Sequence, residues 1–123
     1  MTRGEAGLSY RRPTTPEVLG SIRQHELEAS LGKLGVNEQR FFDYPDGHLA
    51  VVPRAEAVAR IHDALAEIRP DTILTFGPDG FTGHPDHKTL SSWVTAAVRM
   101  WNRPRARLYQ AVVPRYWEDC FVP

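Results

Sequence analysis

Three stretches of the chain carry helix signals, and in two of them the signal is the spacing of apolar residues. Residues 16–34 begin with Pro16 directly after two threonines and are followed by Gly35, which are common start and stop signals of a helix. In residues 54–68 and 86–101 the apolar side chains fall on one face. The two apolar stripes comprise Ala57, Val58, Ile61, Ala64, Leu65 and Ile68, and Leu90, Trp93, Val94, Ala97, Val98 and Trp101. The pattern predicts a helix over each stretch.

Short apolar runs beside these stretches predict strands. Residues 72–76 are rich in β-branched side chains, and residues 108–113 form a similar run. Residues 39–44, with Phe41 beside Phe42, suit a strand that is buried on both faces and ends at a Tyr-Pro-Asp-Gly turn. The predicted elements therefore alternate helix, strand, helix, strand, helix, strand.

This alternation favours parallel strands joined by crossover helices. We therefore expect an α/β protein with a Rossmann-like three-layer sandwich and a mainly parallel sheet. Parallel sheets normally need helices on both faces. A sheet of three strands with three helices is small for such an arrangement. The pattern thus predicts that the chain forms part of a larger sheet.

Composition limits the classes of protein to which the chain can belong and the kinds of partner that it can bind. The chain has 123 residues, enough for one domain, and its formal net charge of zero removes the simplest electrostatic basis for binding nucleic acid or acidic membranes. No apolar run approaches the length of a membrane span. The single cysteine, Cys120, excludes an internal disulfide and fits a reducing cytoplasm. We expect a cytoplasmic protein without nucleic-acid or membrane partners, and the oligomeric state stays open.

One basic segment allows a different interpretation. Six cationic residues lie between positions 88 and 116 without an acidic residue, interleaved with Trp93, Trp101 and Tyr109. Basic patches with aromatic side chains can hold single-stranded nucleic acid. Trp93 and Trp101, however, belong to the apolar helical stripe. We therefore interpret the arginines as residues of the solvent-exposed face of that helix and of the loop that follows it.

The chemistry-bearing residues are concentrated in the loop G-P-D-G-F-T-G-H-P-D-H at positions 77–87. It follows a predicted strand and precedes a predicted helix, where active sites of open α/β sheets collect. His84 and His87 are three residues apart, and Asp86 is close enough to orient an imidazole. A neutral imidazole ligand, a second titratable group and an orienting carboxylate are what metal-assisted hydrolysis requires.

A structural interpretation of the same residues remains open. His84 would cap the helix, Asp86 would complement its dipole, and His87 would lie on the surface. A catalytic zinc usually takes three protein ligands, which one loop with adjacent Asp86 and His87 cannot easily supply. The other histidines, at positions 25, 48 and 62, are isolated in the sequence.

At this loop the chain resembles the LmbE-like family of zinc-dependent N-acetylglucosaminyl deacetylases, which includes PIG-L. Other segments are similar to family motifs in the same order. These are T-R-G-E-A-G at 2–7, I-R-Q-H-E-L at 22–27 followed by L-G-V at 34–36, Y-P-D-G at 44–47, I-R-P-D at 68–71, G-H-P-D-H at 83–87 and L-Y at 108–109. The chain is identified as a member of this family over nearly all of residues 2–113.

The resemblance implies roles for matching positions. His87 would be a zinc ligand. His84 would protonate the leaving amine or stabilise the tetrahedral oxyanion, and Asp86 would tune its basicity. Arg23, and with less support Asp46, would contact hydroxyls of a sugar-like substrate. The structural alternatives are an ion pair of Arg23 with Glu26 or Glu28, and a role for Asp46 in its own turn.

One family motif is absent. H-P-D-D-E, which supplies two zinc ligands and the general base, does not occur, and Met1 aligns with the end of the second family strand. We therefore expect residues 1–123 to form a single partial deacetylase domain whose first βα unit is missing. A βαβ unit takes roughly 30 residues or more.

The expected function follows from the family resemblance together with the absence of the H-P-D-D-E motif. The chain is predicted to be a fragment of an amidohydrolase that removes an N-acyl group, such as acetyl, from an amino-sugar-type substrate. It should be inactive by itself and bind Zn²⁺ weakly or not at all. The alternative is a catalytically silent remnant or binding protein of the same fold. Thirteen Arg against two Lys hint at a bacterial source.

Overall fold

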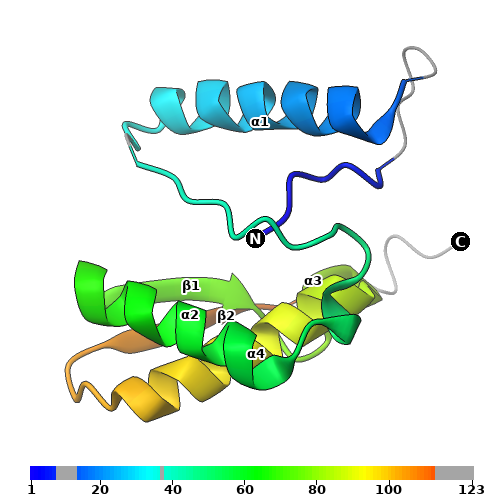
Figure 1. Ribbon diagram of the computed structural model, residues 1–123. Coiled ribbons are helices and arrows are strands. Elements are labelled where there is room, and N and C mark those ends of the chain that lie inside the picture. The colour runs from blue at the N-terminus through cyan, green and yellow to red at the C-terminus, as the bar shows by residue number, and fades with distance from the viewer. Residues whose placement is uncertain (8–13, 37, 113–123) are drawn as a thin grey trace, which may run out of the picture. The chain divides into compact units, whose positions relative to one another are not determined.

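The structure is a computed structural model that describes residues 1–7, 14–36 and 38–112. The chain forms two compact units, Met1–His48 and Leu49–Pro123, and each is described by itself. The elements in chain order are α1 (Pro16–Lys33), the short 3-10 helix η1 (Leu49–Val51), α2 (Arg54–Ile68), β1 (Thr72–Phe76), α3 (Gly80–Gly83), α4 (Pro85–Trp101) and β2 (Arg107–Ala111) (Figure 1). None of the described helices is long and apolar enough to cross a membrane.

Helix α1 forms where the sequence predicts it, because both of its ends carry local signals. Thr15 is the N-cap, and its side chain accepts a hydrogen bond from the Val18 N–H at 3.5 Å. After the last helical residue, Gly35 adopts a φ of +73° and the Val36 N–H donates to the Leu31 carbonyl at 2.9 Å. These bonds satisfy backbone groups that a helix end leaves open.

The strand predicted over residues 39–44 is wrong. Residues 38–45 contain no strand, and the Phe42 N–H makes a single backbone bond, to the Met1 carbonyl at 3.3 Å. Asp43 has a φ of +56°, which interrupts an extended path. The ring of Phe41 instead lies 4.9 Å from the guanidinium carbon of Arg3. The apolar run is thus held by side-chain contacts, since it has no ladder of backbone bonds.

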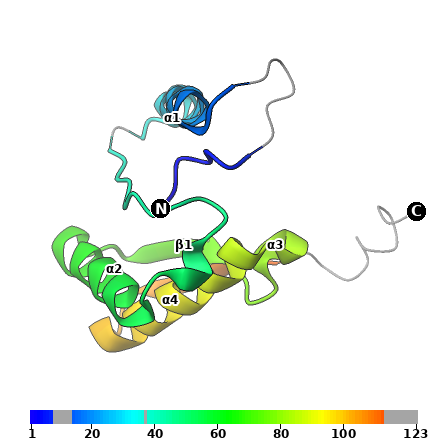
Figure 2. The same ribbon diagram turned by 45° about the vertical axis from the view of Figure 1, so that its right-hand side comes forward.

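The second unit is built on a parallel βαβ arrangement. Strands β1 and β2 pair in parallel with Thr72 opposite Arg107 and Phe76 opposite Ala111, and α4 connects them. Helix α4 packs against both strands, and α2 packs against α4 (Figures 1 and 2). The two helices and both strands confirm the predicted elements and the α/β class, although position 113 of the second predicted strand lies outside the described residues.

The core of this unit uses the two predicted apolar stripes. Its buried side chains are Leu49 of η1, Ala57, Val58, Ile61 and Leu65 of α2, and Trp93, Val94 and Ala97 of α4. The opposite face of the strand pair is open within residues 49–112. Leu74 of β1 is 79% exposed, and Tyr109, its partner in register on β2, is 49% exposed. The described residues therefore form a small parallel α/β unit with two strands.

Candidate functional site

The loop between β1 and α4 follows a tightly constrained backbone path. A Cβ on Gly77 would lie 2.7 Å from both Asp79 Oδ1 and Val112 Cγ1, so the chain passes there only without a side chain. Gly80 has a φ of +75°, and Phe81 follows at φ +65° and ψ −55°, a region that costs a non-glycine residue energy. Asp79 Oδ1 accepts a hydrogen bond from the Phe81 N–H at 3.2 Å. These residues set the direction of the Gly80 carbonyl.

That carbonyl determines which ring nitrogen of His87 carries the proton. Nδ1 of His87 lies 3.1 Å from the Gly80 oxygen, and because a carbonyl only accepts, Nδ1 carries the proton of the neutral ring. The Nε2 lone pair is thereby left for a ligand. The ring of Phe76 stacks on the imidazole at 3.8 Å between centroids with an angle of 4° between the planes. His87 is thus held at one edge and on one face, as metal-binding histidines usually are.

His84 has the complementary proton arrangement. It is the N-cap of α4, and its Nδ1 accepts a hydrogen bond from the Asp86 N–H at 3.2 Å. The neutral ring therefore carries its proton on Nε2, which is a donor. The two imidazole rings lie 4.6 Å apart between centroids. The structure shows the predicted helix-capping role and leaves the far edge of His84 available, so capping and chemistry are compatible.

Asp86 is buried although it is charged. Its carboxylate Oδ1 accepts a hydrogen bond from the Leu49 N–H at 3.1 Å, and only 5% of the residue is exposed. The carboxylate also lies in the first turn of α4, where a negative charge interacts favourably with the helix dipole. Asp86 therefore joins η1 to the start of α4 and reaches His84 through its backbone N–H.

Arg23 and Asp46 belong to the first unit, where both have local partners. Arg23 Nη1 donates to Glu26 Oε2 at 2.9 Å, which is the ion pair that the sequence offered as an alternative. The Asp46 carboxylate accepts hydrogen bonds from Thr2 Oγ1 at 2.8 Å and from the Ala6 N–H at 3.2 Å. Asp46 thus anchors the N-terminal segment within this unit.

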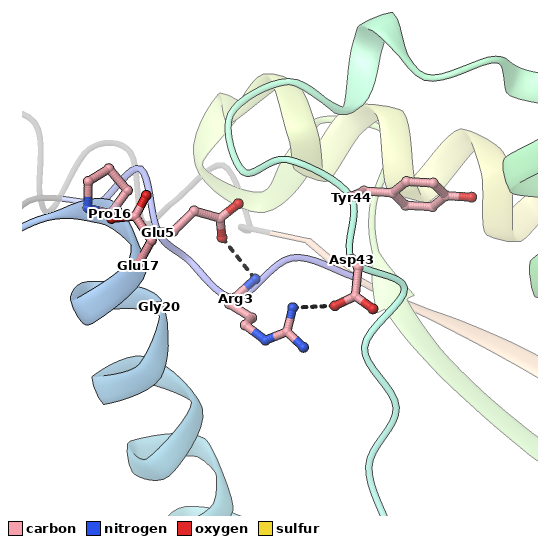
Figure 3. A pocket seen from close by; sticks show the side chains of 7 residues that line it. All are labelled: Arg3, Glu5, Pro16, Glu17, Gly20, Asp43 and Tyr44. Carbon is pink, nitrogen blue, oxygen red and sulfur yellow. Dashed lines mark hydrogen bonds and ion pairs between the residues drawn. The ribbon is translucent and has the colours of Figure 1, made fainter.

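The first unit also contains a cavity of about 210 Å³ (Figure 3). It is lined by Arg3, Glu5, Pro16, Glu17, Gly20, Asp43 and Tyr44. Arg3 points toward Asp43 and forms an ion pair with it, while its backbone N–H donates to Glu5 Oε2 at 3.1 Å (Figure 3). Because Gly20 has no side chain, residues 3 and 5 can approach α1 closely. The sequence did not suggest a binding role for any of these residues, although Arg3 and Glu5 belong to T-R-G-E-A-G and Tyr44 belongs to Y-P-D-G.

Other supporting residues of the histidine pair were also missed. Phe76 ends a predicted strand and Gly80 lies in the glycine-rich loop, so both were near a recognised signal. Leu49 carries no sequence signal, because its role depends on a backbone N–H. The remaining histidines have local contacts through Nδ1: His25 to the Ser21 carbonyl, His48 to the Asp46 carbonyl and His62 to the Asp63 carboxylate.

His87 fits the chemistry of a single metal ligand. Its Nε2 carries a free lone pair, and its other nitrogen is fixed by a backbone acceptor. Within residues 1–7, 14–36 and 38–112, however, no group of three His, Cys, Asp or Glu side chains could hold a metal ion. The described residues thus provide one position of a metal site and do not complete it.

Comparison with known proteins gives a consistent match. Residues 1–98 match the family described as PIG-L: GlcNAc-PI de-N-acetylase. The chain is similar to proteins named 1D-myo-inositol 2-acetamido-2-deoxy-alpha-D-glucopyranoside deacetylase. That of Mycobacterium sp. strain KMS is 34% identical over 114 residues, covering 79% of this chain and 36% of that protein. That of Rhodococcus erythropolis is 38% identical over 96 residues, covering 65% and 33%, respectively. The chain spans about a third of the length of these relatives.

Proposed function

The chain belongs to the PIG-L (GlcNAc-PI de-N-acetylase) family, and from that premise we propose that its 77–87 loop is part of a hydrolytic site that removes an acetyl group from an acetamido sugar. The observation that carries the proposal is the opposite proton arrangement of two adjacent imidazoles. His87 presents a lone pair at Nε2, whereas His84 presents a proton at Nε2. An amide hydrolase needs both kinds of group beside the scissile bond.

His84 is the hydrogen-bond donor in this proposal. With Nδ1 occupied by the Asp86 N–H, the Nε2 proton is free to bond the oxyanion formed when water attacks the acetyl carbonyl. To protonate the leaving amine instead, His84 would first have to become an imidazolium, which places a proton on Nδ1 and breaks the bond from the Asp86 N–H. Asp86 acts as a positioning residue, because its buried carboxylate holds the first turn of α4 to Leu49. Movement of that turn would misplace the imidazole.

His87 is the metal ligand in this proposal. Gly80 and Phe76 orient the imidazole so that Nε2 is the coordinating atom. When bound, Zn²⁺ lowers the pKa of water and polarises a carbonyl group. The described residues contain no group of three that could hold a metal ion, so in this proposal the ligand set is completed from outside them.

Arg23 and Asp46 are proposed to contact the sugar. Arg23 uses one guanidinium nitrogen for Glu26, and its side chain is 45% exposed, so other donors of its five N–H groups remain for hydroxyls. For Asp46 the support is weaker, because both carboxylate oxygens already accept bonds from Thr2 and Ala6. Sugar binding by Asp46 would require the exchange of one of these bonds.

The chain spans about a third of the length of the relatives that it matches. We propose that the parallel strand pair is part of a larger three-layer sheet in the full-length relatives. The exposed face at Leu74 and Tyr109 supports this, because apolar strand faces are normally covered. The isolated chain should accordingly be catalytically silent.

Two measurements test these proposals. Purified chain incubated with an N-acetylglucosaminyl-inositol should release no acetate above background, and chelator-sensitive release would overturn the prediction of silence. The ligand assignment is tested separately by titrating Zn²⁺ into ¹⁵N-labelled chain while recording the imidazole resonances. Nε2 of His87 should shift first, the response should vanish in His87→Ala, and it should persist in His62→Ala. Equal broadening of all five histidines would contradict the assignment.

A further inference from the structure

A second hollow, of about 390 Å³, lies in the second unit beside α4. It is formed by one face of α4, the first residue of α2, the loop after β1 and strand β2. The residues that line it are Arg54, Pro78, Lys88, Ser91, Ser92, Thr95, Ala96, Arg99 and Gln110. Its lining does not include His84, Asp86 or His87, although Pro78 belongs to the same loop and Lys88 directly follows His87.

The lining has a strong positive charge. Arg54, Lys88 and Arg99 contribute three cations, and none of the described residues that line the hollow is an Asp or Glu. None of the three forms an ion pair among the described residues, whereas the nearby Arg103 pairs with Asp71 at 3.2 Å. Unpaired cations around one concave surface attract an anionic ligand, because their charges add and no carboxylate offsets them.

Hydroxyl groups line the hollow between the cations. Gln110 Nε2 donates to Ser91 Oγ at 3.2 Å and to Thr95 Oγ1 at 3.4 Å. Because each hydroxyl accepts from the same amide, its own O–H proton remains to be donated. Ser91 is only 2% exposed, so of these two hydroxyl groups it is that of Thr95 that can reach a ligand in the hollow.

The spacing along α4 indicates the size of the ligand. Lys88, Ser92, Thr95 and Arg99 follow at intervals of four, three and four residues, which places them on one face of the helix. Lys88 and Arg99 are eleven residues apart, about 16 Å along the axis. Both residues nevertheless line the same hollow, with Ser92 and Thr95 between them along the helix, and this arrangement matches an anion with several charged groups better than a single small ion.

We propose that this hollow binds a small molecule that carries two or more phosphate groups. Phosphate oxygens accept hydrogen bonds from hydroxyls and form charge-assisted bonds with Arg and Lys. A single-stranded nucleic acid fits less well, because no aromatic side chain on which a base could stack is among the described residues that line the hollow.

The test is calorimetric titration of the chain with inorganic tripolyphosphate at low salt. Arg99→Gln and Arg54→Gln should each weaken binding about tenfold, the loss of one charge-assisted contact. The matched control is Arg105→Gln, which removes one exposed arginine outside the lining and should change the Kd by less than about twofold. Circular dichroism establishes that each variant is folded.

Three results would overturn the proposal. They are equal weakening by Arg105→Gln, binding of orthophosphate as tight as that of tripolyphosphate, and tighter binding of oligothymidylate. The first would indicate attraction by overall charge, the second a site for one small anion, and the third a nucleic-acid surface. Chemical-shift changes in ¹⁵N-labelled chain should centre on Lys88, Thr95 and Gln110, and changes centred elsewhere would contradict the assigned location.

Discussion

The carbonyl oxygen of Gly80 accepts a hydrogen bond from Nδ1 of His87 at 3.1 Å, across seven residues of chain. This contact sets the tautomer of the imidazole, and Phe76 holds the ring from one face. The geometry depends on Gly80 and Phe81, which both have positive φ. The loop therefore stores conformational strain next to the atom that we propose as a metal ligand.

Gly80→Ala should destabilise the second unit by about 1–3 kcal/mol. The φ of +75° disfavours alanine, and the new Cβ would lie 2.9 Å from Lys88 Cγ and 3.2 Å from the Lys88 nitrogen. The ¹⁵N resonances of His87 should also move toward a mixture of tautomers. The control is Gly32→Ala in α1, which meets nothing within 4 Å and should stabilise by roughly 0.5–1 kcal/mol. Urea unfolding measures both, and a neutral Gly80→Ala would contradict the expectation.

Phe76→Leu should release one face of the His87 ring. The stacked pair contributes about 0.5–1.5 kcal/mol beyond burial, so a modest loss of stability is expected together with a shift of the His87 ring protons. Proton NMR detects the loss of the ring-current effect. Phe41→Leu, in the other unit, should leave those protons unchanged, and an equal shift in both variants would argue against a specific stack.

Asp86→Ala should lower the free energy of unfolding by about 1–3 kcal/mol, because the buried Leu49 N–H loses its acceptor. Asp86→Asn keeps an oxygen in that place and should cost less. Asp63→Ala is the control, since the Asp63 side chain is 81% exposed and such changes usually stay within about 0.5 kcal/mol. Chemical denaturation of the three variants should give the order Asp63→Ala, Asp86→Asn, Asp86→Ala from smallest to largest loss.

Glu17 should contribute a small pH dependence to the stability of α1. A hydrogen bond from its own backbone N–H, and then the Thr15 side chain, lower the pKa of the Glu17 carboxyl. Since the folded pKa lies below the unfolded one, the ionised group stabilises the fold above the unfolded pKa. The contribution is lost as the pH falls through the folded pKa.

Carboxyl ¹³C titration by NMR measures this shift directly. Thr15→Ala should raise the pKa of Glu17 toward its usual value by removing the second cause. Glu56 lies in the first turn of α2, whose N-cap Pro53 makes no side-chain capping bond, and its titration should not respond to Thr15→Ala. An unchanged Glu17 titration in Thr15→Ala would show that the backbone bond alone accounts for the shift.

The elements that were predicted correctly are those with local causes. Pro16 and Gly35 delimit α1, and the apolar stripes of α2 and α4 follow from spacing that a helix alone turns to one face. The histidine loop could be recognised for the same reason, because its glycines and imidazoles are adjacent in the chain. The sequence by itself therefore determined the helices, the two strands and the family, and it drew attention to the loop in which we propose the chemistry.

Only the tertiary structure decided the features that depend on a distant backbone partner. The sequence predicts a strand over residues 39–44, but a strand forms only where a neighbouring strand accepts and donates a series of backbone hydrogen bonds. The bond from the Phe42 N–H to the Met1 carbonyl is not part of such a series. The proton positions on His84 and His87 depend on an N–H and a carbonyl that side-chain patterns do not specify. The burial of Asp86 likewise depends on the N–H of Leu49, 37 residues away. Hydrogen bonds to the main chain are independent of residue type, which is why they had to be observed.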